Sequence, residues 1–294
     1  MAKFSEEILT SWTKPASNSE EIKLANSERM VKEAIKEDDT LKKMTIDTFG
    51  QGSYANDTNV KLDSDVDINV RLSDTVFLQV PPEKKKEDFG YSDSDYTFQE
   101  YKKAVYNALV NKFGKTEVVW EDKCLTVKGN SYRVVTDVVP TFKYMRHDSV
   151  TSKVEGTKFI ADSGKSIINY PIQHIQNGKN KNANTAKSFK RLTRIHKRLR
   201  YKMIDDKIKV SENITSFLLE CLMWNLPNTI YNNNHTWTEI IKQSIIYLYE
   251  QTKEESTCKE WGEVSELLYL FIGRKWSVKD VNDYLILTWE YLEF

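Results

Sequence analysis

The stretch GQGSYANDTNVKLDSDVDINVRL, residues 50–72, places a Gly-Ser pair a few residues ahead of three aspartates spaced two apart. In its second half Val66, Ile68, Val70 and Leu72 alternate with polar residues. Alternation of this kind is typical of a strand with one buried face. The sequence therefore predicts a turn that runs into a half-buried strand, with acidic residues at the strand's beginning.

The alternation separates the three aspartates. Side chains two apart on a strand lie on one face, so we expect Asp65 and Asp67 to point together, and we expect Asp63 to lie in the preceding turn. Neighbouring carboxylates repel each other unless a cation lies between them, and hard oxygen ligands suit Mg²⁺ or Mn²⁺. Two such ions catalyse phosphoryl transfer by activating the attacking oxygen and holding the leaving one. Asp65 and Asp67 are thus candidate catalytic metal ligands.

A third acid and the Gly-Ser pair fit the same chemistry. Asp137 stands alone in the apolar run RVVTDVVPTF, where a charge is costly unless it is paired or bound to a metal. Gly52 allows the backbone to approach a phosphate closely, and Ser53 adds a hydroxyl that can bind a triphosphate. The alternatives are an ordinary acidic surface turn for the first motif and a salt-bridged buried acid for Asp137.

The rest of the chain predicts an α+β (mixed α/β) fold in two lobes. Residues 1–165 alternate helical and strand patterns, beginning with a long amphipathic helix, which favours a lobe built on a mixed sheet. Residues 166–294 are mainly helical, including a predicted helix at residues 262–271, and residues 177–185 form a predicted connecting loop. We expect the active site in the cleft between the lobes.

Composition limits the possible functions. The 43 basic and 43 acidic residues cancel, so no overall charge draws the chain to nucleic acid or to a membrane. The three cysteines match no zinc or disulfide spacing, and no apolar run is long enough to span a bilayer. The four histidines share no metal spacing, and we assign them no catalytic role. These features indicate a cytoplasmic protein.

Residues 163–204 depart from this balance, because they contain eleven Lys or Arg residues and no Asp or Glu. Within this stretch, Lys187, Lys190, Arg194 and Lys197 recur at helical spacing. Such a line of cations is suited to a triphosphate. It is equally typical of a solvated helix face, and RNA binding is a third possibility.

Taken together, the motifs GSYANDT and SDVDINVRL, the lone Asp137, and the segments LTRIHKRLR and SFLLECLMW resemble the cGAS/DncV-like nucleotidyltransferases. This family belongs to the DNA polymerase beta-like superfamily. The resemblance covers about residues 49–224 as ordered motifs, and its bacterial members make cyclic di- or trinucleotide second messengers in anti-phage defence.

The resemblance implies roles for individual positions. Asp65, Asp67 and Asp137 match the three catalytic acids, which bind two Mg²⁺ ions, and Gly52 and Ser53 match the pair that holds the donor triphosphate. Three further positions match nucleotide-binding residues of the helical lobe: Lys197 and Ser216 at the phosphates, and Phe217 stacked on the donor base. The implied 1–165 lobe is the nucleotidyltransferase catalytic lobe.

We therefore predict a Mg²⁺-dependent nucleotidyltransferase that joins nucleoside triphosphates into a cyclic di- or trinucleotide and releases pyrophosphate. The expected partners are the nucleoside triphosphates, a downstream effector reached through the product, and a regulatory protein, with no need for nucleic acid or a membrane. Two alternatives stay open: transfer to an RNA end or a protein side chain, and a non-catalytic nucleotide-binding module.

Overall fold

A computed structural model describes residues 3–15, 18–60 and 65–294 of the chain, so the turn predicted at Asp63 lies outside the described residues. The chain forms two compact units. The sheet unit takes up the described residues of 17–55 and 61–171, and the helical unit takes up those of 1–16, 56–60 and 172–294.

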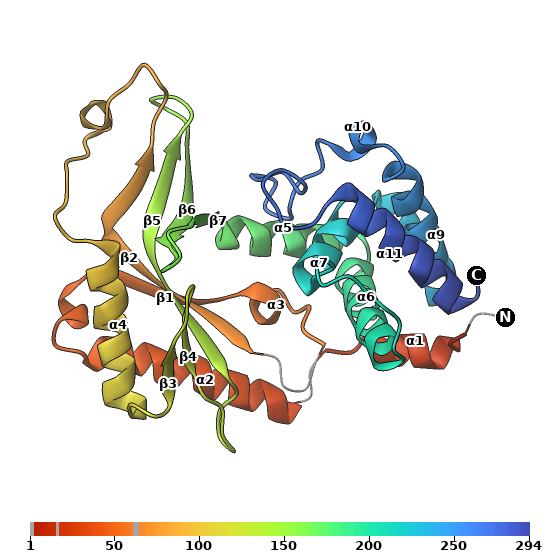
Figure 1. Ribbon diagram of the computed structural model, residues 1–294, viewed down its shortest axis with the longest axis horizontal. Helices are drawn as coiled ribbons and strands as arrows, with labels where there is room; N and C mark the ends of the chain where they lie inside the picture. Colours follow the sequence, from red (N-terminus) through yellow and green to blue (C-terminus); the bar gives the residue numbers. More distant parts are fainter. Residues whose placement is uncertain (1–2, 16–17, 61–64) are drawn as a thin grey trace. The chain divides into compact units, whose positions relative to one another are not determined.

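The sheet unit is built on a seven-stranded mixed sheet (Figure 1). Its main strand order is β1-β2-β5-β4-β3, β6 pairs with the second half of β5, and β7 pairs with β6. Among the strands of the described ranges, β2 and β5 are parallel neighbours and the other pairs are antiparallel. The strands are β1 (Ile46–Gln51), β2 (Val66–Gln79), β3 (Val118–Trp120), β4 (Leu125–Val127), β5 (Thr136–His147), β6 (Lys153–Ile160) and β7 (Ser166–Asn169).

Strand β2 begins where the sequence predicts it, and its four alternating apolar residues are all buried. The prediction of a half-buried strand is wrong beyond Ile68, because the polar residues Asn69 and Arg71, which alternate with the apolar ones, are buried too. Asn69 accepts a hydrogen bond from Thr141, and Arg71 forms ion pairs with Asp47 and Glu155. Strand β2 is therefore a central strand whose second face is filled by paired polar groups.

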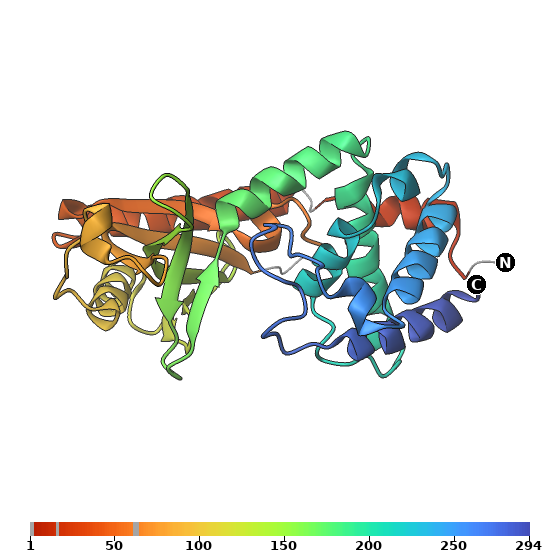
Figure 2. The ribbon, with the colours of Figure 1, turned by 90° about the horizontal axis from the view of Figure 1, so that it is seen from above.

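Two long helices complete the core of the sheet unit. Helices α2 (Asn18–Glu37) and α4 (Phe98–Phe113) contact each other and the sheet (Figures 1 and 2). Helix α4 begins at a capping box, in which Thr97 and Glu100 each accept a hydrogen bond from the other's backbone N–H. Short helical turns complete the sheet unit: η1 (Leu41–Lys43), α3 (Gly52–Ala55) and η2 (Lys86–Phe89).

The helical unit has a separate apolar core around helix α6. Helix α6 contacts α1, α7 and α9. The unit is mainly helical, as predicted, and Ser277 caps its last helix. The helices are α1 (Glu6–Trp12), α5 (Pro171–Asn184), α6 (Ser188–Asp205), α7 (Ser216–Trp224), α8 (Asn228–Asn232), α9 (Trp237–Gln251), α10 (Glu255–Cys258) and α11 (Val278–Leu292).

Two predictions in this unit are wrong. Residues 262–271 form a turn instead of a helix: the N–H of Leu270 donates to the carbonyl of Trp261, and Glu266 has a φ of 60°, which a right-handed helix does not allow. Residues 177–185 are not a loop, because nearly all of them belong to α5. Their polar side chains are used in packing, as where Asn177 donates to the carbonyl of Val264.

Among the helices of the described ranges, none combines the length and the apolar character needed to cross a membrane.

Candidate active site

The three predicted catalytic acids gather at one end of β2 and β5. Asp67 and Asp137 are register partners on these parallel neighbours, so their side chains project from adjacent strands on the same face of the sheet. Asp65 is exposed and lies just before β2 begins. Residues separated by 70 positions in the sequence are thus brought into contact by strand pairing.

The three carboxylates are close enough to affect one another. Burial raises the pKa of Asp67, the neighbouring charges of Asp137 and Asp65 raise it in the same direction, and the three causes together bring it to about 7. Asp137 is fixed by Thr126 on β4, whose hydroxyl donates to Asp137 Oδ1 at 2.7 Å. The site therefore concentrates negative charge in a partly desolvated position.

The Gly-Ser turn packs directly against this charge. Gln51 at the end of β1 pairs with Asp67, and the chain then turns into α3 at Gly52, which has a φ of 68°. A Cβ atom at position 52 would lie 2.1 Å from Asp67 Oδ2. Glycine is required here both by the backbone conformation and by the approach of Asp67. Ser53 follows within the same turn.

The acids fit a divalent cation by their chemistry. Within the described ranges, no three His, Cys, Asp or Glu side chains are arranged as a complete ligand set for a metal. Asp65, Asp67 and Asp137 nevertheless supply only oxygen donors, and the repulsion that raises the pKa of Asp67 is what a bound cation would relieve. Mg²⁺, with its preference for carboxylate oxygens and retained water, suits this donor set.

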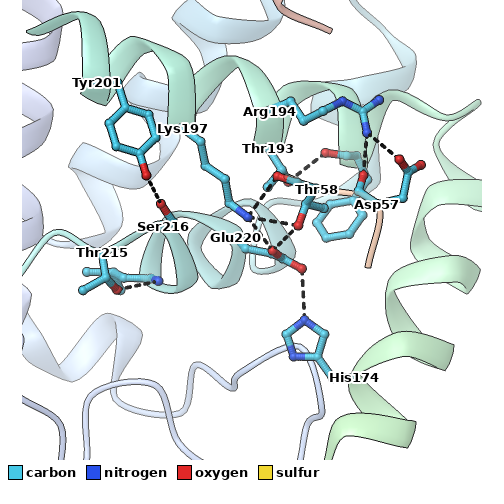
Figure 3. Close-up of polar contacts among 12 residues, drawn as sticks. Asp57, Thr58, His174, Thr193, Arg194, Lys197, Tyr201, Thr215, Ser216 and Glu220 are labelled. Carbon is cyan, nitrogen blue, oxygen red and sulfur yellow. Dashed lines mark hydrogen bonds and ion pairs between the residues drawn. The ribbon is translucent and has the colours of Figure 1, made fainter. Parts of the chain in front are cut away.

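The predicted phosphate-binding Lys197 is buried in the helical unit (Figure 3). Its ammonium group donates to Glu220 Oε2 at 2.8 Å and to Thr58 Oγ1 at 2.9 Å, and its side chain is 2% exposed. Burial of a charge at this depth requires such partners. A phosphate could reach Lys197 only if its ammonium left Glu220, so its role at the phosphates stays a prediction.

Ser216 and Phe217 open helix α7, with Thr215 as its N-cap. The Ser216 hydroxyl lies 3.4 Å from that of Tyr201 (Figure 3). Phe217 is 38% exposed. Its centroid lies 5.9 Å from that of His174 and 6.2 Å from that of Trp276. An exposed ring held by two aromatic neighbours is suited to stack on a base.

Two further polar residues, Glu220 and His174, lie beside these positions and were not predicted from the sequence. Glu220 is buried and accepts from Lys197, from the Thr58 hydroxyl at 2.6 Å, and from His174 Nε2 at 3.0 Å. Glu220 carries the same signal that selected Asp137, since it is the one acid in the apolar run SFLLECLMW. His174 has no comparable signal, because its partner is distant in the sequence.

Part of the basic stretch has a structural role. Of its four cations at helical spacing, Lys187 is exposed, whereas Lys190, Arg194 and Lys197 are buried and do not form a solvated face. Arg194 Nε donates to the carbonyl of Thr13, and Arg198 donates to the carbonyls of Ser11 and Lys14. The last carbonyls of a helix lack partners within it, and these arginines supply partners at the end of α1.

Comparison with known proteins relates this fold to specific relatives. A family model for the cGAS/DncV-like nucleotidyltransferase C-terminal helical domain matches residues 176–293. The chain is 64% identical, over all of both sequences, to the cyclic dipyrimidine nucleotide synthase CdnE of Cecembia lonarensis. It is 35% identical to the cyclic dipurine nucleotide synthase of Elizabethkingia meningoseptica over 99% of each chain.

The solved structures agree. The E. meningoseptica CdnE cyclic dinucleotide synthase with GTP and Apcpp superposes with a TM-score of 0.84 at 32% identity, over 99% of this chain and 100% of that one. The Rhodothermus marinus CdnE c-UMP-AMP synthase superposes with a TM-score of 0.87 at 25% identity, over 98% of this chain and 96% of that one.

A mixed sheet joined to a helical unit, shared along the whole length with these synthases, defines a nucleotidyltransferase. More narrowly, the chain belongs to the cGAS/DncV-like nucleotidyltransferase family, whose CdnE synthases are its relatives. The predicted α+β fold class and the predicted activity, synthesis of a cyclic nucleotide with release of pyrophosphate, are confirmed.

Proposed function

We propose that the chain makes a cyclic dipyrimidine nucleotide from UTP, CTP or both. The proposal rests on the 64% identity, over the full length, to the C. lonarensis synthase named for that product. The cyclic dipyrimidine nucleotide synthase CdnE of Legionella pneumophila, at 36% identity, is in agreement. The E. meningoseptica dipurine synthase is 35% identical, so identity near one third does not distinguish a pyrimidine product from a purine product. The choice of pyrimidines therefore depends on the C. lonarensis relative.

In this proposal the sheet unit carries the catalytic residues, within the lobe of residues 1–165. Asp65, Asp67 and Asp137 hold two Mg²⁺ ions, or Mn²⁺ in their place, which supply stabilisation of the charge on the attacking and leaving oxygens. Asp137 orients the acceptor hydroxyl in this proposal, and its hydrogen bond from Thr126 supports a fixed position for its carboxylate. The N–H groups of the Gly52–Ser53 turn and the Ser53 hydroxyl bind the donor triphosphate.

The helical lobe of residues 166–294 contributes nucleotide contacts. Phe217 stacks on the donor base, and its exposed ring supports this role. Ser216 offers a hydroxyl to the phosphates. Lys197 can join it only by exchanging Glu220 for a phosphate, so its contribution depends on that exchange.

The experiment is an incubation of the purified protein with Mg²⁺ and labelled nucleoside triphosphates, singly, in pairs and all four together, followed by mass spectrometry of the phosphatase-resistant products. The expected products contain uracil or cytosine only. The Asp67→Asn and Asp137→Asn variants should give none. A product formed from ATP and GTP in preference to UTP and CTP would refute the choice of base.

The physiological setting is part of the same proposal. The product acts as a second messenger that activates a downstream effector in bacterial anti-phage defence, and the enzyme works in the cytoplasm, where a regulatory protein controls it. Since the relatives are named as cyclic nucleotide synthases, no observation favours transfer to an RNA end or a purely binding role.

A further inference from the structure

Four side chains of the helical unit form a buried polar cluster that we call the Glu220 cluster: Thr58, His174, Lys197 and Glu220 (Figure 3). Lys197 and the Thr58 hydroxyl both donate to Glu220 Oε2, and His174 Nε2 lies 3.0 Å from Glu220 Oε1. Both carboxylate oxygens are therefore occupied, and one of them faces a histidine.

The cluster determines which nitrogen of His174 carries the proton. Burial alone raises the pKa of Glu220, but the Lys197 charge and the hydrogen bond from His174 outweigh burial and hold the pKa well below its usual range. An ionised carboxylate can only accept hydrogen bonds, so Nε2 of His174 must be the donor. In the neutral ring, Nδ1 is then a hydrogen-bond acceptor.

This acceptor is open to a ligand. In the described residues no hydrogen bond is made to His174 Nδ1, and 11% of the His174 side chain is exposed to solvent. Figure 3 shows it on the side of the ring turned away from Glu220. The same ring lies 5.9 Å from Phe217, centroid to centroid, with the two planes inclined by 36°.

We propose that His174 reads the edge of the base stacked on Phe217, accepting a hydrogen bond at Nδ1, and that Glu220 is the positioning residue that holds it in this state. The proposal deepens the proposed function and rests on Phe217 as its stacking residue. Stacking tolerates any base because every base has an aromatic face, so Phe217 cannot select among bases and a polar neighbour is needed.

The chemistry of the bases gives the direction of the selection. Uracil presents an N3–H donor, which matches the acceptor at Nδ1, whereas cytosine presents a lone pair at N3, which opposes it. A site with a fixed acceptor discriminates against a ligand that leaves that acceptor unpaired. We therefore expect this site to prefer UTP over CTP by about tenfold, the value of one good hydrogen bond.

The test measures the dissociation constants of UTP and CTP analogues whose α,β-bridge cannot be cleaved, with Mg²⁺ present. The His174→Phe variant keeps an aromatic ring beside Phe217 but removes Nδ1, and we expect the preference for the uracil analogue to fall to about one. The Phe217→Leu variant should weaken both analogues by similar factors and leave their ratio unchanged. The Glu220→Gln variant, which no longer fixes the protonated nitrogen, should also reduce the ratio.

A matched variant separates recognition from stability. His196 is another histidine of the helical unit and is almost completely buried, with its Nε2 3.1 Å from the Ser244 hydroxyl. His196→Ala should lower the melting temperature without changing the ratio of the two dissociation constants. A His174→Phe protein that is folded by circular dichroism and keeps the wild-type ratio would overturn the proposal, as would a wild-type protein with no preference.

The outcomes for base choice and for His174 are distinguishable. If mass spectrometry shows a purine product, the proposed function fails, but the inference about His174 is then tested with GTP and ATP analogues. Guanine carries a donor at N1 and adenine an acceptor, so the same acceptor should favour guanine, and His174→Phe should remove that preference. If the product is a pyrimidine and the ratio is insensitive to His174, only the inference about His174 fails.

Discussion

Gly52 and Asp67 lie so close together that position 52 has no room for a side chain. A Cβ atom there would stand 2.1 Å from Asp67 Oδ2 and 3.0 Å from its carboxyl carbon, and Gly52 has a φ of 68°. Gly52 directly follows β1, whose last residue, Gln51, pairs with Asp67 in β2. The turn proposed to hold the triphosphate is thus placed against Asp67, a proposed catalytic acid, by the register of one strand pair.

The first prediction concerns Gly52→Ala. The substitution puts a side chain at a left-handed backbone position, at a cost of about 1–2 kcal/mol in the free energy of unfolding, and displaces the Asp67 carboxylate. Because misplacing a reacting group by about 1 Å can cost roughly a hundredfold in rate, we expect a similar loss of cyclic product. Steady-state pyrophosphate release and urea denaturation measure the two effects.

Gly164→Ala is the matched control for this change. Gly164 has a φ of 84°, and a Cβ there would meet no atom within 4 Å. The variant should lose a similar amount of stability and keep its activity. If Gly52→Ala is as active as Gly164→Ala, close packing of the turn against Asp67 has no catalytic importance.

The second prediction concerns Asp67→Asn in the absence of metal. The pKa of Asp67 is raised to about 7, so at pH 8 the carboxylate is ionised in a buried place beside Asp137 and Asp65. An amide of the same shape removes that cost, and we expect the free energy of unfolding to rise by about 1–3 kcal/mol in EDTA while product formation is lost. Asp67 would then lower the stability of the metal-free protein while being required for activity.

Added Mg²⁺ provides the complementary measurement for Asp67. A ligand that binds only the folded state raises the melting temperature, so Mg²⁺ should stabilise the wild type and have much less effect on Asp67→Asn. An Asp67→Asn protein that is less stable than the wild type in EDTA would contradict the view of this site as a cluster of mutually repelling carboxylates.

The sequence alone selected candidate site residues where a local pattern marks them. Strand alternation selected Asp65 and Asp67, and an acid isolated in an apolar run selected Asp137, because both signals reflect which side chains a strand can bury. The same isolation marks Glu220 in helix α7, but the sequence could not say whether such an acid faces a metal or a lysine. That choice depends on Lys197, which only the packing of α6 against α7 brings to it.

The errors have a common cause in tertiary contacts. Residues 177–185 are rich in asparagine, which favours loops, yet nearly all of them are helical. Asn177 donates to the distant carbonyl of Val264, and Asn182 accepts from the N–H of Lys190 in the next helix. Residues 262–271 have an apolar pattern compatible with a helix, yet they form a turn closed by hydrogen bonds between residues 261–263 and 268–270. One remote contact joins the two segments, since Asn177 donates to the carbonyl of Val264.

The third prediction concerns Lys197→Met. The variant leaves the Glu220 carboxylate buried with no cation beside it, a change that typically costs about 3–5 kcal/mol. We expect a loss near the lower value, because Thr58 and His174 still bond to Glu220. Urea denaturation gives the free energy, and Lys197→Met combined with Glu220→Gln should recover part of it.

The same variant tests the phosphate role predicted for Lys197. If Lys197→Met unfolds at the same urea concentration as the wild type but binds nucleoside triphosphates much more weakly, the ammonium acts on the phosphates and its bond to Glu220 is dispensable. A loss of stability with nucleotide affinity kept, measured below the unfolding transition, would mean that Lys197 serves only as the counter-ion of Glu220.

The fourth prediction is a pH dependence of stability from His196. Burial lowers the pKa of His196 to about 4, and its ring remains neutral beside Ser244 in helix α9. In the unfolded chain the histidine protonates near pH 6.5, so between about pH 6.5 and 4 the unfolded state binds more protons than the folded state. The contribution of His196 to the free energy of unfolding should therefore fall by roughly 3 kcal/mol as the pH drops through this range.

His196→Leu isolates this effect from the titration of carboxylates elsewhere. The variant fills the apolar site, and the Ser244 hydroxyl keeps its hydrogen bond to the carbonyl of Ile241 at 2.7 Å. Urea denaturation of both proteins between pH 4.5 and 7.5 gives the difference in unfolding free energy at each pH. The difference should change in favour of the variant as the pH falls, because only the wild type gains a proton at this position on unfolding; parallel curves would show that His196 is protonated equally in the two states.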